Sequence, residues 1–301
     1  MKGIVLAGGS GTRLYPITEG VSKQLLHVYD KPMIYYPISV LMLAGIKDIL
    51  IITTPEDQAS FKRALGDGSK FGVNLEYVIQ ASPDGLAQAF LLGEEFIENE
   101  PCAMVLGDNI FYGNGLVEEL QNARTNADEG FATIFGYQVK DPKRFGVMEL
   151  DDNKNVISVE EKPRNPKSDF AITGLYFYPK GVSEMAKTVK PSPRPGGRSE
   201  LEITTLNDLY LQKRMLKACL LGGGYTWFDT GTYESMLEAS NMIKAIQSNK
   251  GNVISCLEQI GYKNGWLLLE TLKERAELMS KNTYGEYLNS VVEKGTVKVK
   301  R

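Results

Sequence analysis

The chain has 301 residues, of which 43% are hydrophobic and 24% are charged, and its formal net charge is −3. This composition is ordinary for a globular enzyme, and the small negative charge offers no general attraction to nucleic acid or to an anionic membrane surface. We therefore expect neither nucleic acid nor a membrane as a partner. The sequence has no membrane-length apolar segment, and its three cysteines show no zinc-site spacing, which predicts reduced thiols in a cytoplasmic protein.

The first segment with a specific chemistry follows directly on the initiator methionine. A short apolar run over residues 3–6 is typical of a buried parallel strand, and it leads into the glycines Gly8, Gly9 and Gly11. Glycines let the backbone turn sharply and bring N–H groups close to an anion. Two cations follow, Arg13 and Lys23, so this segment predicts a phosphate-binding loop.

The spacing of these glycines excludes the two most familiar phosphate loops. A P-loop requires Lys-Ser or Lys-Thr after its last glycine, and neither follows here. The dinucleotide-binding pattern G-x-G-x-x-G fits at residues 9 and 11, but Leu14 stands where its third glycine belongs. A dinucleotide-dependent oxidoreductase is therefore disfavoured.

Strand and helix patterns alternate through the first half of the chain. Residues 35–45 have the pattern of a buried helix, 48–54 and 73–79 have the pattern of strands, and 55–65 has that of a short helix between them. This alternation is typical of βαβ units. We predict an α/β fold that is Rossmann-like, with a mixed, mostly parallel central sheet flanked by helices and a helical C-terminal tail.

Two strands of this half end in polar residues that suit a nucleotide. Gln80 supplies both a donor and an acceptor, as a pyrimidine base requires, and Gly85 lets the backbone come close at the start of the next helix. Asp108 follows the buried strand 103–106, and in open α/β sheets ligands bind at the carboxyl ends of strands. The Asp108 carboxylate could hold Mg²⁺ or cap a helix. Gln80 and Gly85 could equally belong to a strand–helix connection that binds nothing.

The second half of the chain carries groups that suit a sugar phosphate. Strand patterns cover residues 131–139, 156–159 and 172–178. Sugar hydroxyls need hydrogen-bond acceptors and the phosphate needs a cation. Glu161, Lys162 and the backbone near Gly146 and Ile172 are chemically suited to both tasks.

Several motifs together resemble the sugar-nucleotide pyrophosphorylase family, in particular its glucose-1-phosphate thymidylyltransferase branch. They are G-S-G-T-R-L at 9–14, S-K-Q-L-L at 22–26, Y-D-K-P-M-I-Y-Y-P at 29–37, Q-A-S-P-D-G-L-A-Q-A at 80–89, L-G-D-N at 106–109, E-E-K-P at 160–163 and W-F-D-T-G-T at 227–232. The resemblance implies the fold of the nucleotide-diphospho-sugar transferases. It also implies a nucleotidyltransferase domain over 1–240, binding nucleotide with roughly 1–130 and sugar with roughly 131–240. The helical tail over 241–301 could cover the core or pair subunits, and we favour a subunit interface.

The resemblance also implies roles for individual residues. Asp108 and Asp229 would hold one Mg²⁺. The catalytic set would be Arg13, Lys23, Asp108, Lys162, Arg198 and Asp229. The nucleotide would contact Leu6, Gly8, Gly9, Gly11, Thr12, Arg13, Gln24, Gln80, Pro83, Gly85 and Asp108. The sugar would contact Asn109, Gly146, Glu161, Lys162, Ile172 and Tyr176.

One of these assignments has a competitor within the chain. The loop over 190–199 is longer than in the family and offers both Arg194 and Arg198 to the sugar phosphate. We favour Arg198 because it adjoins the helix predicted to start near residues 200–204.

The implied reaction converts dTTP and α-D-glucose 1-phosphate into dTDP-glucose and pyrophosphate, in a cytoplasmic homotetramer that feeds deoxysugar synthesis. UTP, or another sugar 1-phosphate, remains an alternative substrate. A non-catalytic protein that binds nucleotide sugars is an alternative of another class. The retained Arg13, Lys23, Asp108 and Asp229 argue against that last alternative.

Overall fold

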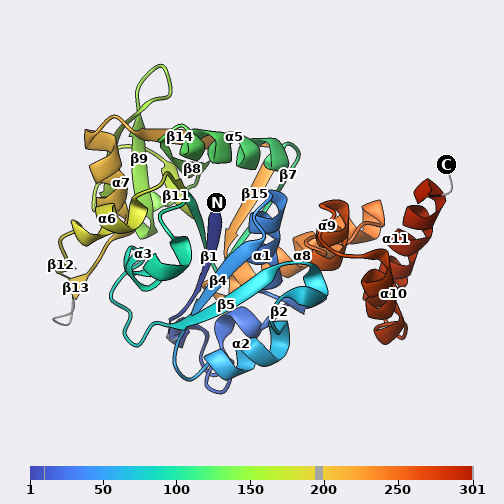
Figure 1. The fold of residues 1–301 in the computed structure, drawn as a ribbon. Coiled ribbons are helices and arrows are strands. Elements are labelled where there is room, and N and C mark those ends of the chain that lie inside the picture. The colour runs from blue at the N-terminus through green and yellow to red at the C-terminus, as the bar shows by residue number, and fades with distance from the viewer. Residues whose placement is uncertain (10, 194–198, 300–301) are drawn as a thin grey trace.

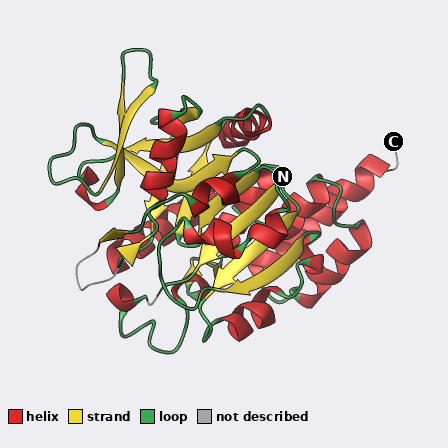
Figure 2. Cartoon of the chain, turned by 60° about the vertical axis from the view of Figure 1, so that its left-hand side comes forward, coloured by secondary structure: helices red, strands yellow, loops and turns green. Residues whose placement is uncertain are grey.

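The computed structural model describes residues 1–9, 11–193 and 199–299. Its centre is one sheet of nine strands, counted over these residues, and Figure 2 shows helices packed around it. In chain order the strands are β1 Lys2–Ala7, β4 Asp48–Thr53, β5 Asn74–Ile79, β6 Cys102–Leu106, β8 Ala132–Gln138, β9 Gly146–Leu150, β10 Val156–Glu161, β11 Phe170–Tyr178 and β14 Leu216–Leu221.

The sheet is mixed. The strands neighbour one another in the order β5–β4–β1–β6–β11–β8–β14, and the β9–β10 hairpin joins at the start of β11. Strands β5, β4, β1 and β6 are parallel, so they end at the same edge of the sheet. Strand β11 runs antiparallel to both β6 and β8. The predicted mixed, mostly parallel sheet is confirmed.

Helices cover both faces of this sheet (Figure 1). In chain order those that pack on it are α1 Tyr35–Leu43, α2 Gln58–Leu65, α3 Gln88–Leu92, α4 Glu94–Ile97, α5 Leu116–Asp128, α6 Val182–Lys187 and α7 Ile203–Gln212. Val5 and Ile4 of β1 enter different hydrophobic clusters, because successive strand residues face opposite sides of a sheet. Ile38 of α1 packs in the cluster of Val5, and Phe90 of α3 packs in that of Ile4. The predicted flanking helices are confirmed.

Gly93 divides the helix that the apolar spacing predicts after Gly85. Helix α3 ends at Leu92 and α4 starts at Glu94. A Cβ atom on Gly93 would lie 3.1 Å from Leu50 Cδ2 and 3.3 Å from Ile4 Cδ1. The missing side chain therefore lets this segment pack closely on β1 and β4.

Short elements complete the part of the chain that is described. Two-stranded ribbons form between β2 His27–Val28 and β3 Lys31–Pro32, between β7 Asn109–Gly113 and β15 Tyr225–Asp229, and between β12 Ser192–Pro193 and β13 Ser199–Glu200. The 3₁₀ turns are η1 Thr12–Leu14, η2 Lys23–Leu25, η3 Ser69–Phe71 and η4 Pro142–Arg144. The β7–β15 ribbon joins two segments that are far apart in the sequence.

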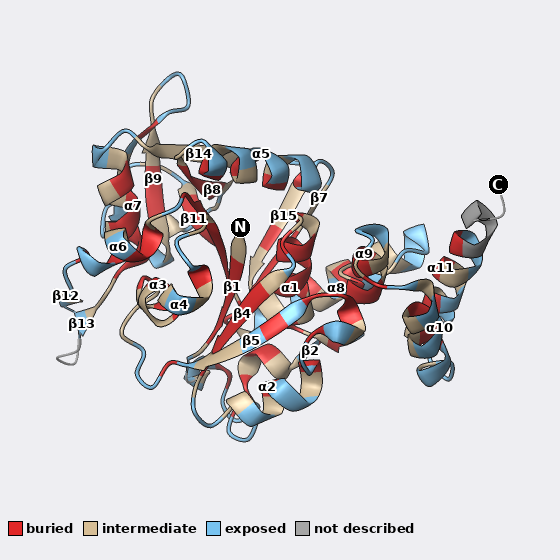
Figure 3. Ribbon diagram, in the orientation of Figure 1, coloured by how far each residue is buried: buried red, intermediate tan, exposed pale blue. Residues whose placement is uncertain are grey.

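The C-terminal tail is helical, as predicted. Its helices are α8 Tyr233–Lys250, α9 Leu257–Lys263, α10 Leu269–Leu278 and α11 Thr283–Val299. Figure 3 shows α10 and α11 beside the sheet rather than over it, with their own buried face, which contains Leu272 and Leu288. The boundary predicted at residue 240 falls inside α8, and a division into separate units stays a prediction. In the described residues, no helix combines the length and apolar character that a membrane span requires.

Candidate active site

The glycine segment after β1 forms the wall of a cavity. Gly9 and Gly11 adopt φ values of 112° and 59°, in the left-handed region that favours glycine. Together with η1, they frame a cavity of about 280 Å³. Its lining consists of Gly8, Gly9, Gly11, Thr12, Arg13, Leu14, Lys23, Asp108 and Gly231. The glycines, Arg13 and Lys23, which the sequence predicts to bind phosphate, therefore line the same cavity.

Backbone pairing brings the two predicted metal ligands together. Asp108 follows β6, and Asp229 ends β15 directly opposite Asn109 in the antiparallel β7–β15 ribbon. Thr230 fixes this arrangement, because its backbone N–H and its hydroxyl donate to the Asp108 carbonyl oxygen at 3.0 and 2.7 Å. The Lys23 ammonium forms an ion pair with the Asp108 carboxylate.

The two carboxyl groups have opposite pKa shifts. Burial acts to raise the pKa of Asp108, but the Lys23 ammonium and hydrogen bonds from Lys23 and Asn109 outweigh it and hold the pKa below its ordinary value. Burial raises the pKa of Asp229, and the neighbouring Asp108 carboxylate raises it further. The charges of Lys23, Arg13 and Arg144 act in the opposite direction without reversing this shift, and two buried carboxylates side by side suit a divalent cation.

A single Mg²⁺ fits this donor set. Among the residues described, no group of three or more acidic, histidine or cysteine side chains could enclose a metal. Mg²⁺ in nucleotide-using enzymes typically takes one or two protein carboxylates and completes its shell with phosphate oxygens and water. Asp108 and Asp229 supply such a pair.

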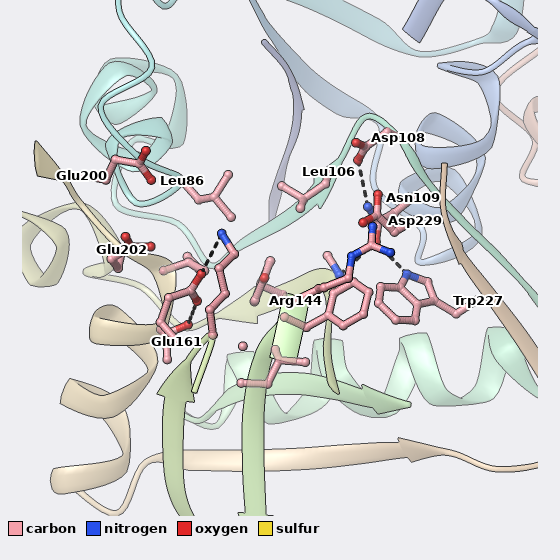
Figure 4. A pocket seen from close by; sticks show the side chains of 18 of the residues that line it. Leu86, Leu106, Asp108, Asn109, Arg144, Glu161, Glu200, Glu202, Trp227 and Asp229 are labelled. Atoms are coloured by element: carbon pink, nitrogen blue, oxygen red, sulfur yellow. Dashed lines mark hydrogen bonds and ion pairs between the residues drawn. The ribbon is translucent and has the colours of Figure 1, made fainter. Parts of the chain in front are cut away.

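A larger cavity of about 650 Å³ adjoins the first and shares Arg13 and Asp108 with it (Figure 4). All six predicted sugar contacts line it: Asn109, Gly146, Glu161, Lys162, Ile172 and Tyr176. Figure 4 shows Asp108, Asn109, Asp229 and Trp227 at one end, and Glu161, Glu200 and Glu202 at the other. The metal-suited carboxylates thus lie at one end, and further carboxylates together with Lys162 lie at the other.

The acceptor end is held by contacts between β9, β10 and α7. Glu161 Oε2 accepts a hydrogen bond of 2.6 Å from the Thr204 hydroxyl, and Lys162 Nζ lies 3.3 Å from Glu161 Oε1. The backbone of Lys162 has a φ of 45°, unusual for a residue with a side chain, and its N–H donates to the Phe145 carbonyl at 3.0 Å. Lys162 is therefore directed by its backbone as well as by Glu161.

Asn109 lines the cavity, but its oxygen is already used inside the protein. Asn109 Oδ1 accepts hydrogen bonds from Trp227 Nε1 at 2.7 Å and from the Gly174 N–H at 3.0 Å. Its Nδ2 donates to Asp108 Oδ1 at 2.9 Å. The side chain thus fixes the position of Asp108, and only the remaining N–H of its amide is free for a sugar.

The predicted base-reading residues lie beside the glycine segment but line neither cavity. Gln80 Oε1 would lie 2.9 Å from a Cβ atom on Gly8, and Gln80 Nε2 donates to Gln88 Oε1 at 2.7 Å. Gln24 Nε2 lies 3.4 Å from the Gly8 carbonyl oxygen. Contacts of the nucleotide with Leu6, Gln24, Gln80, Pro83 and Gly85 stay predictions.

Several cavity residues escaped the sequence analysis, and two predicted ones lie outside the described residues. Those missed are Leu86, Leu106, Lys143, Arg144, Phe145, Gly174, Glu200, Glu202, Ile203, Thr204 and Trp227. Most stand next to a predicted residue, so proximity to the motifs was the available signal. Arg198 and its competitor Arg194 fall among residues 194–198, which the structure does not describe.

Comparison with known proteins agrees with the fold. The model of the nucleotidyl transferase family matches residues 2–246, which is most of the chain. The chain is therefore a nucleotidyltransferase by family.

Curated relatives place the chain within this class. A glucose-1-phosphate thymidylyltransferase of Neisseria meningitidis is 58% identical, covering 98% of this chain and 100% of that protein. Enzymes of the same name from Xanthomonas campestris and Mycolicibacterium smegmatis are 55% and 48% identical, and the alignments cover 98% of this chain in both cases and 98% and 100% of those proteins. The chain belongs to the glucose-1-phosphate thymidylyltransferase family.

Solved structures show the same fold. A candidate glucose-1-phosphate thymidylyltransferase of Bacillus anthracis, in complex with sucrose, aligns with a TM-score of 0.71 at 40% identity, covering 80% of this chain and 94% of that one. A UDP-glucose pyrophosphorylase in complex with UDP-glucose aligns with a TM-score of 0.69 at 24% identity, covering 81% of this chain and 98% of that one.

Proposed function

We propose that this protein converts dTTP and α-D-glucose 1-phosphate into dTDP-glucose and pyrophosphate. The observation that carries the proposal is the meeting of two cavities at Arg13 and Asp108. The smaller cavity has glycines and cations for a triphosphate. The larger has carboxylates for sugar hydroxyls and Lys162 for a phosphate. A reaction between the two substrates takes place where the cavities join.

The chemistry needs positioning and charge neutralisation more than proton transfer. An oxygen of the sugar phosphate forms a bond to the α-phosphorus of dTTP, and the bond from that phosphorus to the bridging oxygen breaks, releasing pyrophosphate. The attacking oxygen is already anionic, so no general base is required. This agrees with the position of His27, the chain's single histidine, which is exposed and lines neither cavity.

The cations of the site have distinct tasks in this proposal. Arg13 and Lys23 bind the triphosphate, and Lys162 binds the incoming sugar phosphate. Asp108 and Asp229 hold Mg²⁺, which when bound neutralises phosphate charge during the displacement. Lys23 pairs with Asp108 in the structure, and a metal held by the two carboxylates would free its ammonium for the phosphate oxygens.

The base assignment rests on Gln80, whose amide offers a donor and an acceptor beside the glycine segment. Uracil differs from thymine by one methyl group, which discriminates weakly, so UTP is the nearest alternative substrate. The experiment is to incubate the pure protein with Mg²⁺, glucose 1-phosphate and each of dTTP, UTP, CTP and ATP, and to measure pyrophosphate. We expect dTTP to react fastest.

Two outcomes would contradict the proposal. Equal rates with CTP and dTTP would refute the base assignment, since cytosine reverses a donor and an acceptor. Pyrophosphate release with none of the nucleotides would favour the non-catalytic alternative. An Asp108→Asn variant serves as the matched control for contaminating activity.

We further propose that the tail pairs subunits in a cytoplasmic homo-oligomer, a tetramer by resemblance. Support comes from the position of α10 and α11, which lie beside the sheet rather than over it and enclose a small apolar cluster of their own (Figure 3). Light scattering of the pure protein tests the assembly, and a monomer would refute it.

A further inference from the structure

Arg144 lies in the wall of the larger cavity without a task in the mechanism above. It ends the η4 turn that leads from β8 into β9, and its side chain is exposed. Figure 4 draws its side chain toward the group that contains Asn109 and Asp229, and its charge acts on the Asp229 carboxylate. It does not line the smaller cavity. Arg144 therefore faces the sugar-phosphate side of the reaction and not the glycine segment.

A chain of aromatic contacts supports the guanidinium. Arg144 Cζ lies 5.9 Å from the centroid of the Phe145 ring, and that ring meets Trp227 edge-on with centroids 5.2 Å apart. Trp227 in turn donates its hydrogen bond to Asn109, which holds Asp108. Arg144 is thus connected to the metal site through packed side chains and is not an isolated surface cation.

The same turn is also joined to Lys162. The Phe145 carbonyl accepts a hydrogen bond of 3.0 Å from the Lys162 N–H. The backbone segments that carry Arg144 and Lys162 are therefore neighbours. Both residues line the same cavity, with the Lys162 ammonium beside Glu161 at one end of it and Arg144 toward Asp229.

The closest ion pairs of the site do not include Arg144, although its positive charge acts to lower the pKa of the nearby Asp229. Among the described residues, Lys23 pairs with Asp108 and Lys162 with Glu161, whereas Arg144 forms no ion pair with a carboxylate. The cavity it lines also contains Asp108, Asp229 and Glu161, which repel an incoming phosphate dianion. A further cation on this side offsets that repulsion, and a guanidinium can bind two phosphate oxygens at once.

We propose that Arg144 binds the phosphate group of the sugar 1-phosphate and stays bound to it as the sugar-linked phosphate of the product. This inference rests on the proposed function, because it assigns a residue to one of the two substrates. It gives the sugar phosphate a second cation that is independent of Lys162 and of the loop over 190–199.

The test is steady-state kinetics of Arg144→Gln and Arg144→Lys in both directions. Loss of a charge-assisted hydrogen bond predicts that Arg144→Gln lowers kcat/KM for glucose 1-phosphate by about 10- to 100-fold, with KM for dTTP unchanged. Arg144→Lys keeps the charge without the fork and should lose less. In the reverse direction KM for dTDP-glucose should rise and KM for pyrophosphate should not.

The matched control is Arg63→Gln, which removes an exposed arginine on α2 that lines neither cavity. If the wild-type protein releases no pyrophosphate, the proposed function fails. If the wild type is active and Arg144→Gln keeps its KM and kcat for glucose 1-phosphate, only the inference about Arg144 fails. A raised Mg²⁺ requirement with an unchanged KM for glucose 1-phosphate also refutes it, because Arg144 would then act through Asp229. Thermal unfolding of each variant confirms that it is folded.

Discussion

Replacing Asn109 by leucine tests whether the site is built on one buried amide. Asn109 is 2% exposed, and its oxygen accepts from Trp227 Nε1 at 2.7 Å and from the Gly174 N–H at 3.0 Å. Leucine is of similar size but accepts nothing, so both donors become unsatisfied in the interior. Each such donor costs about 1–3 kcal/mol, which predicts a loss of about 2–6 kcal/mol in the free energy of unfolding.

Trp227→Phe is the informative comparison. It removes one donor and leaves none unsatisfied, because Asn109 Oδ1 still accepts from Gly174. The expected loss is about 1–2 kcal/mol, from one hydrogen bond and a smaller ring. In the Asn109→Leu background the same change removes an unsatisfied indole N–H, so it should cost much less or even stabilise. The predicted coupling is about 1–3 kcal/mol.

The assay is thermal unfolding of the four proteins at one protein concentration, since assembly would make the midpoint depend on concentration. In a chain of this size 1 kcal/mol corresponds to roughly 2 °C, so Asn109→Leu should lower the midpoint by roughly 4–12 °C. Effects that simply add, within about 0.5 kcal/mol, would refute the reasoning. They would mean that the contact between Trp227 and Asn109 contributes nothing beyond packing.

The remaining predictions concern the carboxylates of the site and the tail. Asp108→Asn and Asp229→Asn should each lose most of the pyrophosphate release at saturating Mg²⁺, and the double variant should be little worse, because both carboxylates bind one ion. Near-normal turnover in either single variant would show that the replaced residue is not a metal ligand. The pKa of Asp229 is raised in the folded protein, so the metal-free protein should lose stability as the pH rises through that pKa. Asp229→Asn should therefore raise the unfolding midpoint of the metal-free protein at pH 7 and flatten this pH dependence. An unchanged pH profile of the unfolding midpoint would contradict the raised pKa. Glu258→Gln should destabilise the tail by about 3 kcal/mol, because the buried Glu258 carboxylate accepts hydrogen bonds from Arg275 at 3.0 Å and from Tyr284 at 2.7 Å. Faster proteolysis of α10 and α11 is the readout, and the exposed Glu274→Gln is the control.

The parallel part of the fold was predictable because its signals are local. The strands β1, β4 and β6 are continuous apolar runs, and Ile4, Leu50 and Met104 are indeed fully buried in them. The glycine segment was predictable for the same reason, since its turn conformation depends on residues adjacent in the chain. In contrast, nothing local announces that β11 runs antiparallel between β6 and β8.

The pairing of Asp108 with Asp229 could not be derived from residue patterns. It depends on the register of the β7–β15 ribbon, in which Asp229 faces Asn109. A shift by one residue would turn the Asp229 side chain to the other face of the ribbon. That register is fixed by the hydrogen bonds of Thr230 and Trp227, which are tertiary contacts. Only the resemblance to a family connected the two residues beforehand.

Gly85 shows how a correct residue can have a different physical reason. Its φ of 105° favours glycine, and a Cβ atom there would lie 2.4 Å from the Leu201 carbonyl oxygen, which is protein backbone and not open space. The Leu201 N–H donates to the Asp84 carbonyl at 2.7 Å, and the Ala87 N–H donates to the Leu201 carbonyl at 3.0 Å. The segment predicted to read the base is therefore bonded to the segment that precedes α7 and lines the sugar cavity. A glycine in a motif indicates that something approaches closely, and here the approaching group is the other half of the site. It follows that a larger residue at Gly85 would disturb nucleotide and sugar binding together.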